Sequence, residues 1–189
     1  MKQNILPAIR LTLARMLFFC ILYPLLIFSF AQAAPNKGAG ETVVLNHRTA
    51  GYRLEGQQFT DDRYFQGRPS AVAYHATASG GSNKGTSNPD YLKQVQEKID
   101  SFLAHNPGVR KEDIPSDLVT ASASGLDPDI SVQAARVQVE RIAKRRNIAA
   151  RLLNTLVEEH IQKPFAGFLG TARINVLQLN LDLDGLKNK

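Results

Sequence analysis

Cysteine is almost missing from this sequence of 189 residues, and acidic residues are missing from its first 40. The single cysteine, Cys20, lies in an apolar stretch, so no intrachain disulfide can form and the rest of the chain must be stable without cross-links. Lys2, Arg10 and Arg15 are the only charged residues before position 32, and the other 20 basic residues stand against 17 acidic ones. Because this remainder is nearly neutral, it lacks the positive surface that binds nucleic acid, and we expect no nucleic-acid partner.

The sequence also lacks the motifs that mark common enzymes. The Gly-rich stretch at 79–89 has its lysine before the second glycine, which is not the G-x-x-x-x-G-K-[ST] spacing of a phosphate-binding loop. Neither a G-x-S-x-G nucleophile elbow nor an S-x-x-K pair occurs. The histidines form no i, i+4 pair for a metal ion; they are His47, His75, His105 and His160. We therefore expect a non-catalytic chain that binds no metal and no cofactor alone, with 79–89 as a surface or interface loop.

One long apolar run lies near the N-terminus. Residues 16–31 carry no charge, and extending the helix back to Leu11 gives about 31 Å, enough for a hydrocarbon core of about 30 Å. All three cations precede the apolar core, so the positive-inside rule places residues 1–10 in the cytoplasm and everything after a transmembrane helix at 11–32 outside it. Pro24 lacks an N–H group, which predicts a kink and favours packing against other helices.

The same run is also compatible with a cleaved signal peptide. Ala31, Gln32 and Ala33 have the small-x-small pattern of a cleavage site. The long N-terminal region and Arg15 next to the apolar core favour a retained anchor instead. The alternative is a free exported binding or interaction protein.

The exported part is predicted to be one compact α+β domain at 41–189, joined to the helix by a Pro/Gly-rich linker at 33–40. Short strands are expected at 43–45 and 51–59 because of their β-branched and aromatic content. Helices are expected from apolar periodicity and capping residues. They run from Pro89, capped by Asn88, to near Asn106, from Ser131 to Arg146, and from Ala149 to His160.

The tail from Arg173 to Asp184 is ambiguous. Ile174, Val176 and the later alternating leucines favour a strand. Asn175 as an N-cap before Val176 would open a short helix instead.

Several ordered blocks of residues resemble one known family. The chain is similar to KdpC, the small accessory subunit of the bacterial Kdp potassium-transporting P-type ATPase, over nearly its whole length. The blocks that carry the resemblance are LYPL at 22–25, YFQGRPSA at 64–71, ASGGSN at 78–83, DLVTAS at 117–122, SGLDP at 124–128, GFLG at 167–170 and NVL at 175–177.

The resemblance implies a single-pass protein of the bacterial inner membrane, with its N-terminus in the cytoplasm and its C-terminal domain in the periplasm. It favours the retained anchor over the signal peptide. Its implied partners are the membrane, a subunit that conducts potassium and a subunit that hydrolyses ATP. The chain would perform neither step. It would assist assembly and act as a catalytic chaperone that raises the ATP affinity of the hydrolysing subunit, so ATP would be met only through the complex.

The resemblance also assigns site residues. Gln138 matches a glutamine implicated in the ATP effect, yet the charge bias places it outside the cytoplasm, where a structural role and an allosteric effect are the simpler interpretation. Tyr23 and Pro24 are expected to pack in the membrane. The candidate subunit contacts are Tyr64, Phe65, Arg68, Gly80, Gly81, Ser82 and Asn83.

Overall fold

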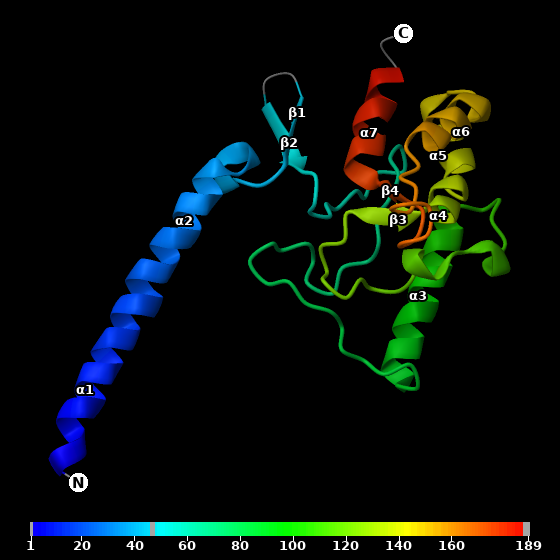
Figure 1. Cartoon of the computed structure of the whole chain (residues 1–189). Helices are drawn as coiled ribbons and strands as arrows, with labels where there is room; N and C mark the ends of the chain where they lie inside the picture. The colour runs from blue at the N-terminus through cyan, green and yellow to red at the C-terminus, as the bar shows by residue number, and fades with distance from the viewer. Residues whose placement is uncertain (1, 46–47, 187–189) are drawn as a thin grey trace. The chain divides into compact units, whose positions relative to one another are not determined.

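The structure is a computed structural model that describes residues 2–45 and 48–186 (Figure 1). His47, one of the four histidines considered above, lies outside the described residues. The chain divides into two compact units, Met1–Thr42 and Val43–Lys189.

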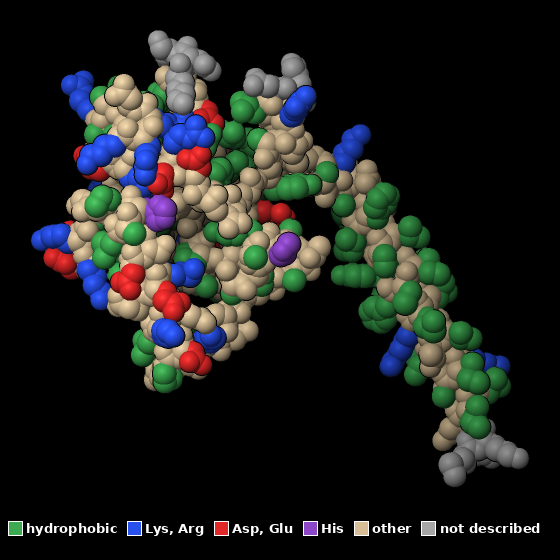
Figure 2. Space-filling view, turned by 180° about the vertical axis from the view of Figure 1, so that it is seen from behind, with side chains coloured by type: hydrophobic (Ala, Val, Ile, Leu, Met, Phe, Trp, Pro, Cys, Tyr) green, Lys and Arg blue, Asp and Glu red, His purple; other side chains and the backbone are tan. Residues whose placement is uncertain are grey.

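The N-terminal unit is one long helical stretch. It consists of α1 (Lys2–Leu17), a π-helical turn η1 (Phe18–Leu22) and α2 (Tyr23–Ala33), followed by a 3-10 turn η2 (Pro35–Gly38). Asn4–Ala33 is long and apolar enough to cross a membrane, and the side chains of residues 4–30 are all exposed. Hydrophobic side chains cover most of the face of this helix that is seen in Figure 2, a composition that suits lipid or neighbouring helices.

The helix departs from α geometry immediately before Pro24. The Tyr23 amide donates to the Phe18 carbonyl, five residues back, instead of the usual four. Single π turns of this kind mark the irregular points of long helices. The structure thus has a π turn directly before Pro24, and the kink expected there stays a prediction.

The second unit contains α3 (Pro89–His105), α4 (Val132–Arg136), α5 (Val139–Arg146) and α6 (Ala150–Glu159), with short 3-10 turns η3 (Lys111–Asp113) and η4 (Ser116–Leu118). The predicted caps are present. The Asn88 side chain accepts from the Tyr91 amide at 3.1 Å, and the Ser131 hydroxyl accepts from the Ala134 amide at 3.0 Å.

The single helix expected from Ser131 to Arg146 is wrong, because the chain breaks between α4 and α5. The Gln138 side-chain amide donates to the Ala134 carbonyl at 3.0 Å, taking the acceptor that its own backbone N–H would use in a continuous helix. The Gln138 backbone N–H turns instead to the Ala135 carbonyl, three residues back. The Gln138 side chain thus satisfies the Ala134 carbonyl at the break between α4 and α5.

Two small sheets complete the unit. β1 (Thr42–Leu45) pairs with β2 (Arg48–Tyr52), and β3 (Asp129–Ser131) pairs antiparallel with β4 (Arg173–Asn175) with Ile130 opposite Ile174.

The strand expected over 51–59 is wrong beyond Tyr52. The Gly56 amide donates to the Leu126 carbonyl at 2.7 Å, and a Cβ on Gly56 would lie 2.5 Å from the Asp127 carbonyl oxygen. This segment therefore lies against the 126–127 backbone rather than in a sheet.

The strand expected over the whole tail is also wrong, and the alternative of a helix capped by Asn175 is correct. α7 (Val176–Gly185) begins where the Asn175 side chain accepts from the Gln178 amide at 3.1 Å. Val176, Leu179 and Leu183 are buried with helical spacing.

The core of the second unit lies where α4, α5, α6 and α7 pack around the β3–β4 pair (Figure 1). The predicted α+β composition is therefore confirmed. The largest fully buried apolar side chains of the core are Phe65, Ile130, Ile142, Leu153, Ile174, Leu179, Leu183 and Val157.

Candidate functional site

Two side-chain amides hold the segment 61–70 against the helices. Asn180 of α7 accepts from the Phe65 amide at 2.9 Å and donates to the Phe65 carbonyl at 2.9 Å. Gln138 accepts from the Gln66 amide at 2.8 Å and donates to the Gln66 carbonyl at 3.1 Å. Each amide thus satisfies both backbone groups of one residue, as a neighbouring β-strand would. We call Gln138 and Asn180 the amide clamp.

Arg141 reinforces this clamp from α5. Its guanidinium donates to the Gln138 side-chain oxygen at 2.7 Å, to the Asn106 side-chain oxygen at 2.9 Å and to the Tyr64 carbonyl at 3.1 Å, and it also reaches the Asp62 carbonyl. Burial lowers the pKa of Arg141, while the nearby Asp62 carboxylate opposes that shift. An arginine side chain stays protonated even when its pKa is lowered by burial. The site therefore holds a buried cation whose N–H groups donate mainly to uncharged oxygen atoms.

Arg146 fixes Tyr64 in the same segment. Its guanidinium carbon lies 4.5 Å from the centre of the Tyr64 ring, its Nε donates to the Arg63 carbonyl at 2.7 Å, and its Nη1 pairs with Asp184 at 2.7 Å. The Tyr64 hydroxyl donates to the same Asp184 carboxylate at 3.1 Å. The Arg146 side chain is only 2% exposed although it ends a run of three cations.

The structure places the expected contact residues of 64–68 at different depths. Phe65 is fully buried, so its side chain belongs to the core rather than to a surface. Tyr64 is partly buried beneath Arg146, and Arg68 pairs with Asp127 at 2.9 Å. The clamp and the two arginines therefore hold this segment in place, and a subunit contact through Tyr64 or Arg68 stays a prediction.

The Gly-rich loop is fixed at its base and exposed at its tip. The Gly80 amide donates to the Ser124 carbonyl at 2.8 Å. A Cβ on Gly125, which has φ +70°, would lie 2.8 Å from the Gly80 carbonyl oxygen, so only glycine allows this close approach. Gly81 is half-buried beside Ala123, whereas Ser82 and Asn83 are exposed.

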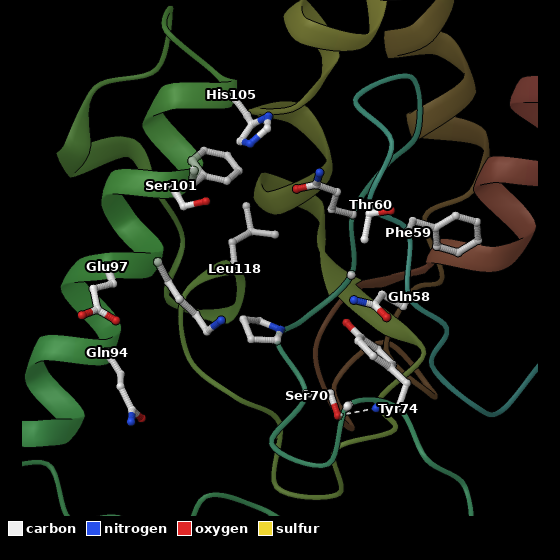
Figure 3. Close-up of a pocket in the computed structure, with 16 residues that line it drawn as sticks. Gln58, Phe59, Thr60, Ser70, Tyr74, Gln94, Glu97, Ser101, His105 and Leu118 are labelled. Atoms are coloured by element: carbon white, nitrogen blue, oxygen red, sulfur yellow. Dashed lines mark hydrogen bonds between the residues drawn. The ribbon is translucent and has the colours of Figure 1, made fainter.

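A groove of about 770 Å³ with a mixed polar and apolar lining lies between α3 and the segment 58–74. Side chains from α3 face those from the segment across it (Figure 3). Burial raises the pKa of the Tyr74 hydroxyl on the segment side. The groove offers amides and hydroxyls for hydrogen bonding; its polar lining includes Gln58, Thr60, Gln66, Ser70, Tyr74, Gln94, Glu97, Lys98, Ser101 and His105.

Sequence reasoning missed Arg141, Arg146 and Asn180 as site residues. Arg146 follows Val139 and Ile142 at i+7 and i+4, which puts a cation on the buried stripe of α5. That position in the sequence could have identified Arg146 as a buried cation.

Across residues 2–45 and 48–186, no group of three or more His, Cys, Asp or Glu side chains is arranged to hold a metal ion.

A turn at 164–169 exposes large apolar side chains. Phe165 and Leu169 exchange backbone hydrogen bonds at 2.9 and 3.0 Å, which closes the turn. Phe165 is 78% exposed, Phe168 76% and Leu169 54%. Three exposed apolar side chains on one short turn are typical of an interaction site.

Comparison with known proteins gives one consistent result. Residues 5–185 match the family model described as KdpC: K+-transporting ATPase, c chain. The potassium-transporting ATPase KdpC subunit of Flavobacterium psychrophilum is 50% identical over 185 residues, which cover 98% of this chain and 100% of the relative. The corresponding subunit of Bacteroides fragilis is 46% identical, covering 99% and 100%, and that of Bacillus cereus is 45% identical, covering 98% and 97%.

Proposed function

Because this chain belongs to the KdpC family, the c chains of K+-transporting ATPases, we propose that it is a non-catalytic subunit of an ATP-driven potassium uptake complex. The family is that of an accessory chain rather than the catalytic one. The proposed partners are the potassium-conducting and ATP-hydrolysing subunits, which the chain helps to assemble.

The proposed location is the bacterial inner membrane, with the second unit in the periplasm. The apolar helix Asn4–Ala33 supports a single membrane span. Lys2 precedes this helix, Arg10 and Arg15 lie in its first half, and no acidic residue precedes Glu41, which supports a cytoplasmic N-terminus. A topology reporter fused after the last residue is expected to be active only outside the cytoplasm.

We further propose that the chain raises the ATP affinity of the hydrolysing subunit without touching ATP through Gln138. The observation that carries this is the saturation of the Gln138 amide. Its oxygen accepts from Gln66 and Arg141, its nitrogen donates to Gln66 and Ala134, and the side chain is 0% exposed. A nucleotide would have to replace these buried bonds, which would leave the partner groups unpaired. Any effect on ATP affinity is then a coupling through subunit contacts.

Comparison of the purified complex with and without this chain tests the proposal. We expect the ATPase lacking the chain to need more ATP for half-maximal potassium-stimulated hydrolysis. In the intact complex, a photoreactive ATP analogue is expected to label the hydrolysing subunit and not this chain. A complex that is fully assembled and equally active without the chain would contradict the accessory role. Labelling of this chain near Gln138 would contradict the allosteric part alone.

Because the side chain of Phe65 is buried, we propose that exposed residues elsewhere make the subunit contacts. These residues are the turn at 164–169, which we call the aromatic turn, and the tip of the Gly-rich loop at Ser82 and Asn83. Exposed aromatic side chains are the residues that most often anchor protein interfaces, because they bury a large area with few rotatable bonds.

A further inference from the structure

The hairpin formed by β1 and β2 exposes apolar side chains that the second unit does not cover. Leu45 is 43% exposed, Tyr52 44% and Leu54, two residues after β2, 66%. Val44, 60% exposed, precedes Leu45 in β1 and therefore points to the opposite face of the strand. We call Leu45, Tyr52 and Leu54 the hairpin surface. Among the residues that the structure describes, its sheet consists of β1 and β2 alone. An isolated two-stranded hairpin is marginally stable in water and gains stability from a surface on which it can pack.

The position of the hairpin in the chain limits what that surface can be. Residues 34–41 alone separate the end of α2 at Ala33 from the start of β1 at Thr42. Even a fully extended stretch of this length spans at most about 30 Å. A hairpin so tethered to a membrane helix meets the same bilayer at a high effective concentration.

The composition of the hairpin suits the headgroup layer. Tyrosine is enriched at membrane interfaces, where its ring lies among the acyl ends and its hydroxyl stays in water. Arg48 in β2 is exposed and can pair with lipid phosphates, to which guanidinium groups bind well. The hairpin thus combines apolar side chains, an amphipathic aromatic residue and a cation next to the membrane anchor.

We propose that the hairpin surface docks on the headgroup layer of the bilayer that its own N-terminal helix spans, and so holds the second unit close to the membrane. This inference rests on the proposed membrane anchor, but not on any subunit contact. The chain would then contact the bilayer twice, first through the N-terminal helix and again, after the linker, through the hairpin.

Tryptophan fluorescence tests this directly, because the chain contains no tryptophan. Leu54→Trp is the reporter, and Leu92→Trp on α3, where the native leucine is 54% exposed, is the matched control. Each full-length variant is reconstituted alone into bilayers of phosphatidylcholine and phosphatidylglycerol, with and without phosphatidylcholine brominated near the glycerol end. Retention of the chain in the bilayer is measured first. Tyr52→Trp serves as a second reporter if Leu54→Trp alters the circular dichroism spectrum.

We expect the hairpin reporter to emit at shorter wavelength than the control and to lose fluorescence on brominated lipid, while the control is quenched by aqueous iodide. Equal quenching of both positions by iodide in a chain that is retained in the bilayer would overturn the docking proposal and leave the anchor intact. If the reporter becomes protected from iodide only after the other ATPase subunits are added, the docking proposal is also wrong, and the hairpin surface contacts a protein partner instead. A chain that is not retained in the bilayer would overturn the anchor itself, and the docking with it.

Discussion

The side chain of Gln138 hydrogen-bonds the backbone of Gln66 in both directions, across 72 residues of sequence. The bonds measure 2.8 Å to the Gln66 amide and 3.1 Å from the Gln138 amide to the Gln66 carbonyl. The same side chain donates to the Ala134 carbonyl at the break between α4 and α5. One glutamine therefore makes both a local backbone contact and a long-range contact within this chain.

Replacing Gln138 by alanine should destabilise the second unit. The substitution leaves the Gln66 backbone groups and one Arg141 donor without their buried partner, and each such loss costs about 1–3 kcal/mol. The measurement is the free energy of unfolding in urea, with Gln133→Ala, an exposed glutamine on α4, as the matched control. A Gln138→Ala protein of unchanged stability whose complex nevertheless binds ATP more weakly would contradict the structural role.

The contributions of Asn180 and Gln138 to the free energy of unfolding should be coupled. Asn180→Ala removes both bonds to Phe65, the neighbour of Gln66 in the clamped segment. Once one amide is lost, the segment is less ordered and the second amide contributes less, so the double variant should be less destabilised than the sum of the single ones. A double-mutant cycle on the free energy of unfolding measures this coupling, which is typically about 0.5–3 kcal/mol for residues in one network. Strict additivity would show that the two amides act independently.

Arg146 should not tolerate lysine, although the charge is conserved. Lysine has no planar fork that can reach both the Arg63 carbonyl and the Asp184 carboxylate while lying over the Tyr64 ring. We expect Arg146→Lys to lower the free energy of unfolding by about 1.5–3 kcal/mol, the range for hydrogen bonds to charged groups. Arg145→Lys is the control, because the side chain of Arg145 is 61% exposed. Equal effects at the two positions would contradict the assigned role of Arg146.

The caps could be predicted from the sequence because they depend on neighbouring residues. Asn88, Ser131 and Asn175 each accept a hydrogen bond from an amide three residues ahead, within one turn of the same helix. The strand expected for the tail was wrong because the prediction assumed that every second residue lies on one buried face. The buried residues Val176, Leu179 and Leu183 have the spacing of a helix instead.

The amide clamp could not be predicted, because its partners are far apart in sequence. No local pattern connects Gln138 with Gln66 or Asn180 with Phe65, and pairing over such separations is determined by the packing of the whole unit. The same reason applies to Phe65. Next to Tyr64 and Arg68 it has the composition of a contact surface, and only the packing of α7 and α5 over it places its ring in the core.

Stability should depend on pH through Asp61. The hydrogen bonds from the Arg63 side chain lower the pKa of Asp61 from 3.8 to about 2. Because the folded pKa lies below the unfolded one, the ionised carboxylate stabilises the folded state above 3.8, and this contribution is lost as the pH falls toward 2. The pair is exposed, so the effect is small and weakens in salt.

Asp61→Asn should therefore be less stable than the original protein at neutral pH, and the difference should disappear between pH 4 and about pH 2. Thermal unfolding over this range measures it, with Glu159→Gln, an exposed carboxylate at the end of α6, as the control. A difference that persists unchanged at the lowest pH would mean that Asp61 acts through something other than its charge.

The aromatic turn provides the most direct test of where the chain meets its partners. Phe168 is 76% exposed, so Phe168→Ser removes little packing within the chain and should leave the free energy of unfolding within about 0.5 kcal/mol of the original. If the turn is an interface anchor, the same change should lower the amount of this chain that co-purifies with a tagged ATP-hydrolysing subunit. Leu92→Ser is the matched control, an exposed apolar residue on α3 whose loss should not affect assembly. Benzoylphenylalanine at position 168 then identifies the neighbour in the purified complex: a cross-link to another subunit supports the contact, whereas cross-links to lipid alone, or normal co-purification of Phe168→Ser, would show that the turn is not where the subunits join.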